Sequence, residues 1–132
     1  MRKDASTNAR NEHHLRTTCS MVYALDLIGG RWKPTILWRL TLTPRLRYSQ
    51  LRQEIRGVSE RMLVLQLREL EQAGLVQRTV YPVVPPRVEY NLTARGHSLR
   101  PVLEAITAWG EAQQQQDSLG VAVQTAAASE TR

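Results

Sequence analysis

Two arginines on one face of an amphipathic segment are the side chains with the clearest chemistry in this chain. The segment SERMLVLQLRELEQAG (residues 59–74) repeats leucine at positions 63, 67 and 70, the spacing of a helix with one buried face. With that face inward, the opposite side presents Arg61, Val64, Leu65 and Arg68. Arginine forms paired hydrogen bonds with guanine edges or phosphates, and aliphatic side chains contact thymine methyl groups. The pattern indicates a helix that reads the DNA major groove, and packing of Val64 or Leu65 against a neighbouring element is the alternative.

A shorter helix precedes this segment. Residues 49–57 (SQLRQEIRG) place Leu51 and Ile55 four positions apart, begin with a capping serine and end in glycine. A short helix, a turn and a longer amphipathic helix predict a helix-turn-helix, in which the second helix enters the groove and the first crosses the backbone. Donors at the two helix starts are placed to meet phosphates. We expect phosphate contacts from Ser49, Gln50 and Ser59, of which the two serines also cap their helices.

A stiff hairpin follows the second helix. The segments QRTVY (77–81) and VEYNL (88–92) are rich in residues that favour strands, and PVVPP lies between them. A hairpin directly after a helix-turn-helix predicts a winged helix. The prolines hold φ at about −65°, so the tip loses little entropy on binding. Arg87 follows them directly and is expected to contact the DNA backbone or a narrow minor groove. Which alternate residues of the first strand face inward stays open.

Three further segments have helical apolar patterns, at residues 20–30, 33–42 and 94–113. Pro101 should kink or divide the last of them near Ser98. The expected fold is therefore mainly α with a small β-hairpin. Two of these segments carry more apolar side chains than one short domain can cover, so we expect a homodimer through the N- and C-terminal helices. The expected interface residues are Met21, Leu25, Leu99, Val102, Leu103, Ile106 and Trp109.

Composition divides the 132-residue chain into one domain and two tails. Residues 19–112 form the expected winged helix-turn-helix domain, between a flexible basic and polar tail at 1–18 and a flexible Gln/Ala-rich tail at 113–132. The domain holds 13 basic and 8 acidic residues, and 16 of the 18 basic residues of the chain are arginine. This excess favours a polyanionic partner. No apolar run suits a membrane span and no secretory leader is evident, so we expect a cytoplasmic protein.

Three segments together resemble the HxlR family of bacterial winged-helix regulators, which are relatives of the MarR type. They are ALDLIGGRWKPTILWRL, RYSQLRQEIRGVSERMLVLQLRELEQAGLV and VYPVVPPRVEYNLTARGHSLRPVLEAITAWG, and they span about residues 19–112. Within them, GGRWKP and YPVVPPRVEY are highly specific motifs. The resemblance implies a homodimeric transcription factor that binds an inverted repeat in double-stranded DNA. It does not identify the target genes.

Cys19 is the single cysteine and lies just before the first helix of the expected domain. Members of the resembled family often carry a cysteine at this position, and some use it to sense electrophiles or oxidants. A thiol near a helix N-terminus lies in a positive potential, which favours thiolate chemistry. Because the chain has no second cysteine, a sensing reaction would give an adduct or a disulfide between subunits. Ordinary packing of a small apolar residue is the alternative.

Other chemistry finds little support in the sequence. His13 and His14 are adjacent and lack a metal-binding pattern, and neither a glycine-rich phosphate loop nor an activated nucleophile is evident. We therefore expect no metal, no cofactor and no enzymatic activity. The expected function is that of a repressor that binds a palindromic operator as a homodimer. Two alternatives remain, a winged helix that serves as a protein-interaction module and a regulator controlled by a small ligand at the dimer interface.

Overall fold

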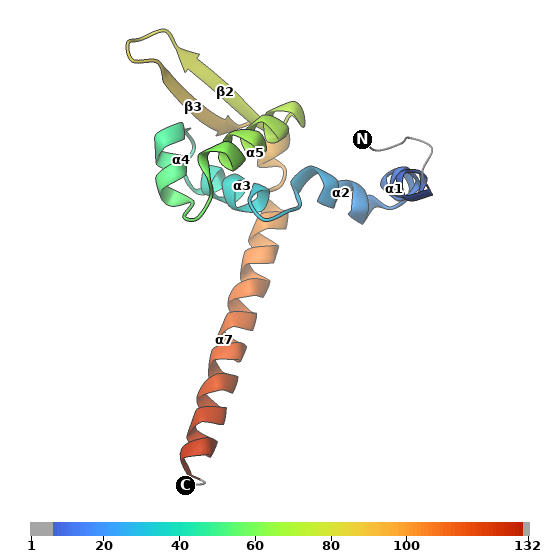
Figure 1. The fold of residues 1–132 in the computed structure, drawn as a ribbon, viewed down its shortest axis with the longest axis vertical. Coiled ribbons are helices and arrows are strands. Elements are labelled where there is room, and N and C mark those ends of the chain that lie inside the picture. The colour runs from blue at the N-terminus through green and yellow to red at the C-terminus, as the bar shows by residue number, and fades with distance from the viewer. Residues whose placement is uncertain (1–6, 131–132) are drawn as a thin grey trace. The chain divides into compact units, whose positions relative to one another are not determined.

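Figure 1 shows a helical chain with one small sheet. The computed structural model describes the backbone of residues 7–130 and the side chains of residues 7–14 and 18–121. Its elements are α1 (Thr7–Thr18), α2 (Ser20–Ile28), α3 (Lys33–Leu42), β1 (Leu46–Arg47), α4 (Tyr48–Glu54), α5 (Glu60–Gln72), β2 (Val76–Tyr81), β3 (Arg87–Leu92), α6 (Ala94–His97) and α7 (Arg100–Glu130). The order of α4, α5 and the β2–β3 hairpin confirms the predicted winged helix-turn-helix, mainly α with a small β component. One compact unit ends at Ser98, and a second begins at Leu99 and contains α7.

The core of the first unit is made by one face each of α3, α4 and α5 together with buried residues of the sheet. Its fully buried side chains are Ile36, Leu37, Leu40, Leu51, Leu63, Leu67, Leu70 and Val76. The three leucines of α5 that the sequence pattern turned inward are all among them, so this prediction is confirmed. Burial of an aliphatic side chain of this size contributes about 1.5–3 kcal/mol to folding relative to an exposed one. The buried stripe therefore determines which face of α5 remains for a ligand.

An ion pair joins α5 to α3. The Lys33 ammonium lies 2.7 Å from a carboxylate oxygen of Glu69, and the lysine side chain is only 13% exposed. Lys33 opens α3 directly before Pro34, which lies in the first helical turn where its missing N–H donor is not needed. The Glu69 side chain is 42% exposed, so solvent screens the pair in part and its contribution to stability is modest. The second helix of the helix-turn-helix is thus anchored both by leucines and by a charge contact.

The sheet has three antiparallel strands in the order β1–β3–β2, one strand more than the predicted hairpin. In the hairpin, Val76 pairs with Leu92 and Arg78 with Tyr90, so these residues share one face. This register answers the question that imperfect alternation left open. The additional strand β1 consists of two residues and pairs Leu46 with Tyr90. A two-residue strand has no alternation to detect, which is why the sequence pattern missed it.

The N-cap of α5 agrees with the sequence prediction, and that of α4 does not. Ser59 caps α5 as predicted, because its hydroxyl oxygen accepts a hydrogen bond of 3.1 Å from the Met62 N–H. Ser49 does not cap α4, which begins one residue earlier, at Tyr48. There the side-chain oxygen of Gln50 accepts from the Arg47 N–H at 2.8 Å. The prediction for Ser49 was wrong because β1 runs directly into α4 and moves the helix start.

Side chains beyond the wing close its base. The Thr93 hydroxyl donates to the Gly74 carbonyl oxygen at 2.6 Å, and the Thr93 N–H donates to the Leu75 carbonyl oxygen at 3.1 Å. Arg95 donates to the carbonyl oxygen of Ala73, the residue that follows α5, also at 2.6 Å. Carbonyl groups at a helix end lack partners within the helix, and these donors supply them. The end of α5 and the return of the wing are therefore fastened together.

Helix extends through the segments that were expected to be flexible tails. α1 covers Thr7–Thr18, and α7 runs to Glu130 through most of residues 113–132. The difference has a local reason, because glutamine, alanine and glutamate all favour helix and no proline interrupts the second segment. The predicted division at Ser98 is confirmed, since α6 ends at His97 and α7 begins at Arg100. Pro101 lies in the first turn of α7.

Gly96 allows α6 to approach the backbone at the base of the wing. A Cβ atom at this position would lie 2.2 Å from the Leu75 carbonyl oxygen and 3.1 Å from a methyl group of Leu92. We expect Gly96→Ala to lower the free energy of unfolding by about 1–3 kcal/mol, because the backbone must move to admit the methyl group. The measurement is urea unfolding followed by circular dichroism. Gly110→Ala in α7 is the control, since a Cβ there meets no atom within 4 Å; it should be neutral or stabilising, and equal losses would contradict the explanation.

Candidate nucleic-acid interface

The helix-turn-helix is built by α4, α5 and the turn between them. Gly57 lies in this turn with φ +88°, a conformation that side-chain-bearing residues rarely adopt. An ion pair of 3.7 Å joins Arg52 on α4 to Glu60 at the start of α5. Both partners are more than half exposed, so this pair contributes little to stability. The turn and the buried leucines, rather than the surface charges, set the angle between the two helices.

The outward face of α5 carries the side chains that the sequence assigned to DNA. Arg61 and Arg68 are exposed, and Leu65 keeps 45% of its surface accessible. Val64 is half-buried. Within one chain, Leu65 is thus largely accessible to a ligand, whereas Val64 is packed in part. An exposed leucine between two exposed arginines is unfavourable in water, but it suits a surface that meets the methyl groups and edges of bases.

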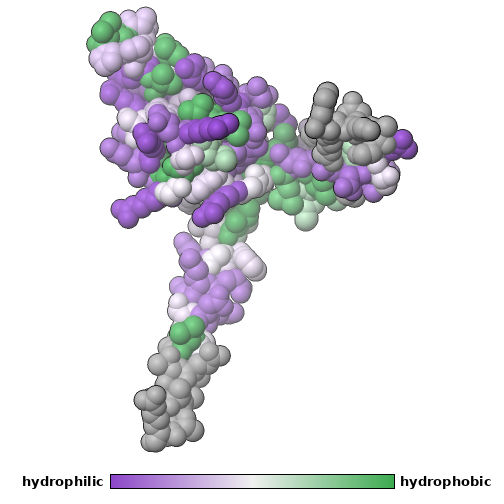
Figure 2. All heavy atoms as spheres, viewed as in Figure 1, coloured by the Kyte–Doolittle hydropathy of each residue, from purple (hydrophilic) through white to green (hydrophobic). Residues whose placement is uncertain are grey.

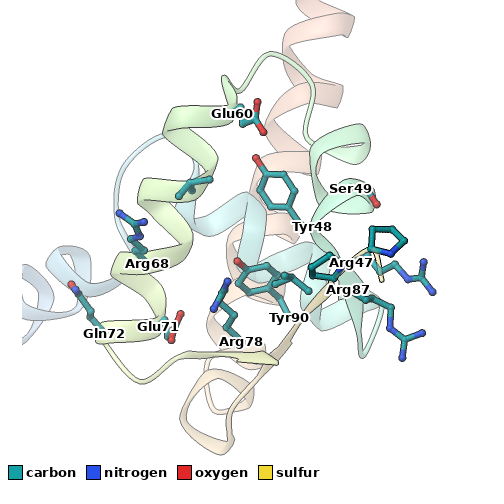
Figure 3. A pocket seen from close by; sticks show the side chains of 14 residues that line it. Arg47, Tyr48, Ser49, Glu60, Arg68, Glu71, Gln72, Arg78, Arg87 and Tyr90 are labelled. Carbon is teal, nitrogen blue, oxygen red and sulfur yellow. The ribbon is translucent and has the colours of Figure 1, made fainter. Parts of the chain in front are cut away.

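A groove of about 890 Å³ separates α5 from the wing. Its walls come from the start of α4, one side of α5 and the β2–β3 hairpin (Figure 3). The lining residues are Arg47, Tyr48, Ser49, Glu60, Val64, Arg68, Glu71, Gln72, Arg78, Pro85, Pro86, Arg87, Val88 and Tyr90. Four arginines against two glutamates give the lining a positive excess, with aliphatic and aromatic surface between the charges. This combination suits a polyanion that also offers apolar edges.

Tyr48 stands at the end of the groove where α4 and α5 meet. Figure 3 shows its ring reaching across toward Glu60, and its hydroxyl is shielded from solvent. Burial, and then the nearby Glu60 carboxylate, raise the pKa of Tyr48 above its ordinary value of 10.0. A raised pKa means that the folded state holds the phenol proton more tightly than the unfolded state does. The free energy of unfolding is therefore unaffected by this group below pH 10.0, and it falls as pH rises from 10.0 through the higher folded-state pKa. Near neutral pH the hydroxyl therefore remains a hydrogen-bond donor.

The groove gathers half of the residues predicted to bind DNA. Its lining includes Ser49, Val64, Arg68 and Arg87, but not Gln50, Ser59, Arg61 or Leu65. It also includes Arg47, Tyr48 and Arg78, which the sequence pattern did not reveal. Arg47 directly precedes the helix start and could have been found once β1 was recognised. Arg78 required the strand register, because only its pairing with Tyr90 places it on the side of the sheet that faces α5.

Two of the predicted phosphate contacts already serve as cap residues. The Ser59 oxygen accepts from the Met62 N–H, and the Gln50 side-chain oxygen accepts from the Arg47 N–H. Each of these groups also has donors, the serine O–H and the glutamine NH₂, which a cap does not use. Both residues are exposed. Their role as phosphate contacts stays a prediction that is compatible with their role at the helix starts.

Cys19 lies outside this groove, as the residue before α2. Its carbonyl oxygen accepts from the Tyr23 N–H at 3.1 Å, and its side chain is partly exposed. Within the described residues, no group of three or more His, Cys, Asp or Glu side chains could hold a metal ion. Across the same part of the chain, every helix is too short or too polar to cross a membrane.

The residues predicted to form a dimer interface differ in exposure. Met21 (70%), Leu25 (55%), Ile106 (54%) and Trp109 (69%) have large accessible surfaces, Val102 is 45% exposed, and Leu99 is half-buried. Leu103 is only 3% exposed and has little surface left for a partner. Figure 2 shows hydrophobic residues on the visible surface of α2 and near the start of α7. Each of these helices, taken by itself, therefore presents apolar side chains to solvent.

Comparison with known proteins places the chain in a family. The HxlR-like helix-turn-helix family matches residues 27–118, and the chain belongs to it. An HTH-type transcriptional regulator of Methanothermobacter thermautotrophicus is 47% identical over 93 residues, which are 70% of each protein. The structure of the redox regulator HypR in its oxidized form is similar with a TM-score of 0.68 and 41% identity, over 71% of this chain and 96% of HypR. The HTH-type regulator ytcD gives a TM-score of 0.70 and 40% identity, over 74% of this chain and 99% of ytcD.

The groove geometry and these similarities agree on the class of protein. The chain is a transcriptional regulator with a winged helix-turn-helix fold of the HxlR and MarR type. The expected resemblance is thereby confirmed.

Proposed function

We propose that the protein binds double-stranded DNA sequence-specifically, as a homodimer on an inverted-repeat operator, and represses transcription from the promoter that it covers. The groove between α5 and the wing carries this proposal, because arginines and apolar side chains converge there from three elements. Arg61, Leu65 and Arg68 on α5 read base edges, while Ser49, Gln50 and Ser59 contact phosphates. Exposed apolar side chains on α2 and α7 supply the dimer contacts. Two-fold symmetry then spaces the two copies of α5 about 34 Å apart, one turn of DNA.

Selection of bound duplexes from a random-sequence library tests this function directly. The expected product is a palindromic sequence, bound by two chains, with an affinity that falls steeply between about 50 and 200 mM salt because counterions are released. Sedimentation analysis of the complex gives the number of chains. Binding that depends on neither sequence nor salt would instead indicate a protein-interaction module with an incidental basic face.

Cys19 gives this regulator a route to respond to oxidants. The support comes from its partly exposed thiol and from the likeness to HypR, which is named a redox regulator and is known in oxidized and reduced forms. Cys19 is the single cysteine of the chain, so the oxidised product is an adduct with a small thiol or a disulfide between two subunits. Both products alter the residue directly before α2.

Cys19→Ser is expected to abolish the response of DNA binding to thiol reagents. Treating the wild type with diamide or a quinone should change its affinity for the selected duplex, whereas the variant should bind equally well before and after treatment. Mass spectrometry identifies the product on the wild-type chain. The same response in both proteins would eliminate thiol sensing and favour a small ligand at the dimer interface.

A further inference from the structure

Three side chains of the wing and one from the segment before β1 form a connected set, which we call the wing network: Tyr81, Arg87, Glu89 and Arg45. The Glu89 carboxylate lies 3.4 Å from Nε of Arg87 and 3.9 Å from Nε of Arg45. The Arg87 guanidinium lies over the Tyr81 ring, 4.2 Å from its centre, and Arg45 donates to the Tyr81 hydroxyl at 3.4 Å. Every member thus contacts two others. By strand alternation Tyr81, Arg87 and Glu89 lie on the face of the hairpin opposite Tyr90, and Arg87, next to the tip, also contributes to the lining of the groove.

Burial assigns different roles to the members. The Glu89 side chain is only 13% exposed, whereas that of Arg45 is 63% and that of Arg87 is 38% exposed. Moving a shielded carboxylate away from its two cations costs free energy, because a charge that is removed from water needs a partner of opposite charge. Nε of Arg87 is shielded from solvent and has only a charge contact with Glu89, without a hydrogen bond, and the face of the guanidinium lies on Tyr81. These contacts leave its two terminal nitrogens for a ligand. The Glu89 carboxylate is the shielded member that both arginines contact, and the arginines are the more exposed members.

We propose that Glu89 is a positioning residue for DNA binding, which holds Arg45 and Arg87 side by side so that their terminal nitrogens contact phosphates next to the segment that α5 reads. This inference rests on the proposed function. Long side chains lose rotamer freedom when they bind, and ordering them beforehand removes that cost from the binding step. Two guanidinium groups around one carboxylate also keep the network net positive. Tyr81 completes the support by stacking against Arg87.

Glu89→Gln tests the inference because charge and positioning predict opposite results. The substitution removes a negative charge at nearly constant shape, so bulk electrostatics alone predicts tighter DNA binding. Loss of positioning predicts weaker binding, by about tenfold for the duplex selected by the wild type. The slope of log affinity against log salt should also become shallower, by about 0.9 for each phosphate that the arginines no longer neutralise. Fluorescence anisotropy over a salt series measures both quantities.

Two controls keep the outcomes separate. Glu54→Gln makes the same charge change on an exposed residue of α4 and should leave affinity unchanged or slightly higher. In a double-mutant cycle, Arg45→Gln and Arg87→Gln should be coupled, so that the second substitution lowers DNA affinity less after the first than it does alone. This cycle tests the inference even if Glu89→Gln does not fold stably. Equal or tighter binding by Glu89→Gln, or independent effects of the two arginines, would overturn the inference. Failure of the wild type to select any sequence would instead remove the proposed function.

Discussion

Replacing Arg68 by alanine is expected to weaken binding to the selected duplex by about 1–3 kcal/mol if, as we propose, its guanidinium reads a base edge from α5. Arg68 is exposed, lines the groove and lies on the face opposite the buried leucines. Its loss should also relax the sequence preference at one position of each half-site. Titrations of the selected duplex and of its single-base variants measure both effects.

Arg100→Ala provides the matched control for charge. Arg100 is an exposed arginine at the start of α7 that pairs with Glu104 one helical turn away. Its removal lowers the net charge by the same amount but takes nothing from the groove, so affinity should change little and sequence preference should not change. An equal loss for Arg68→Ala on every duplex would reassign Arg68 to a phosphate contact. No loss on any duplex would contradict the groove assignment.

Replacing Leu67, the neighbour of Arg68, by alanine is expected to lower the free energy of unfolding by about 2–5 kcal/mol. Leu67 is 1% exposed and lies between Leu63 and Leu70 in the buried stripe of α5. The substitution leaves a cavity that a packed core fills only in part. For a domain of this size, such a loss is a large fraction of its total stability. Urea unfolding followed by tryptophan fluorescence gives the midpoint and the slope.

Leu65→Ala on the same helix is the control that separates the effect of lost burial on stability from the effect of a change in helix propensity. Leu65 is 45% exposed, so the same chemical change should alter stability by only about 0.5 kcal/mol. Its effect should appear instead in DNA binding, where the leucine offers apolar contact to thymine methyl groups. Similar unfolding curves for Leu65→Ala and Leu67→Ala would mean that α5 turns a different face toward the core.

The sequence predicted best where one side of an element is buried. The leucine spacing of α5 was enough to identify both its core face and its free face, and Ser59 and Gly74 marked its ends. Prediction was weaker where pairing between strands decides the outcome. Arg78 belongs to the groove only because β2 pairs with β3 in one register, and no local pattern reveals that register.

The same limit applies to the contacts of Arg87. The sequence placed Arg87 after a rigid tip, but its contacts with Tyr81 and Glu89 depend on cross-strand neighbours and on Arg45 from a distant segment. Helix in the terminal segments was missed for another reason. Polar composition was taken to exclude structure, whereas a helix needs only favourable backbone propensity along its length.

The fastening of the wing at its base has a consequence for engineering. Thr93 holds Gly74 and Leu75, and Arg95 holds Ala73, so both ends of the hairpin are fastened where they leave the domain. Beyond that point the tip is exposed, and Val84 at its end is 99% accessible. We expect a tip changed at Pro82, Val83 and Val84 to leave α5 in place, because these three residues do not line the groove. If the wing contacts DNA as proposed, its tip is the part on which affinity for flanking DNA can be tuned separately from recognition by the helix.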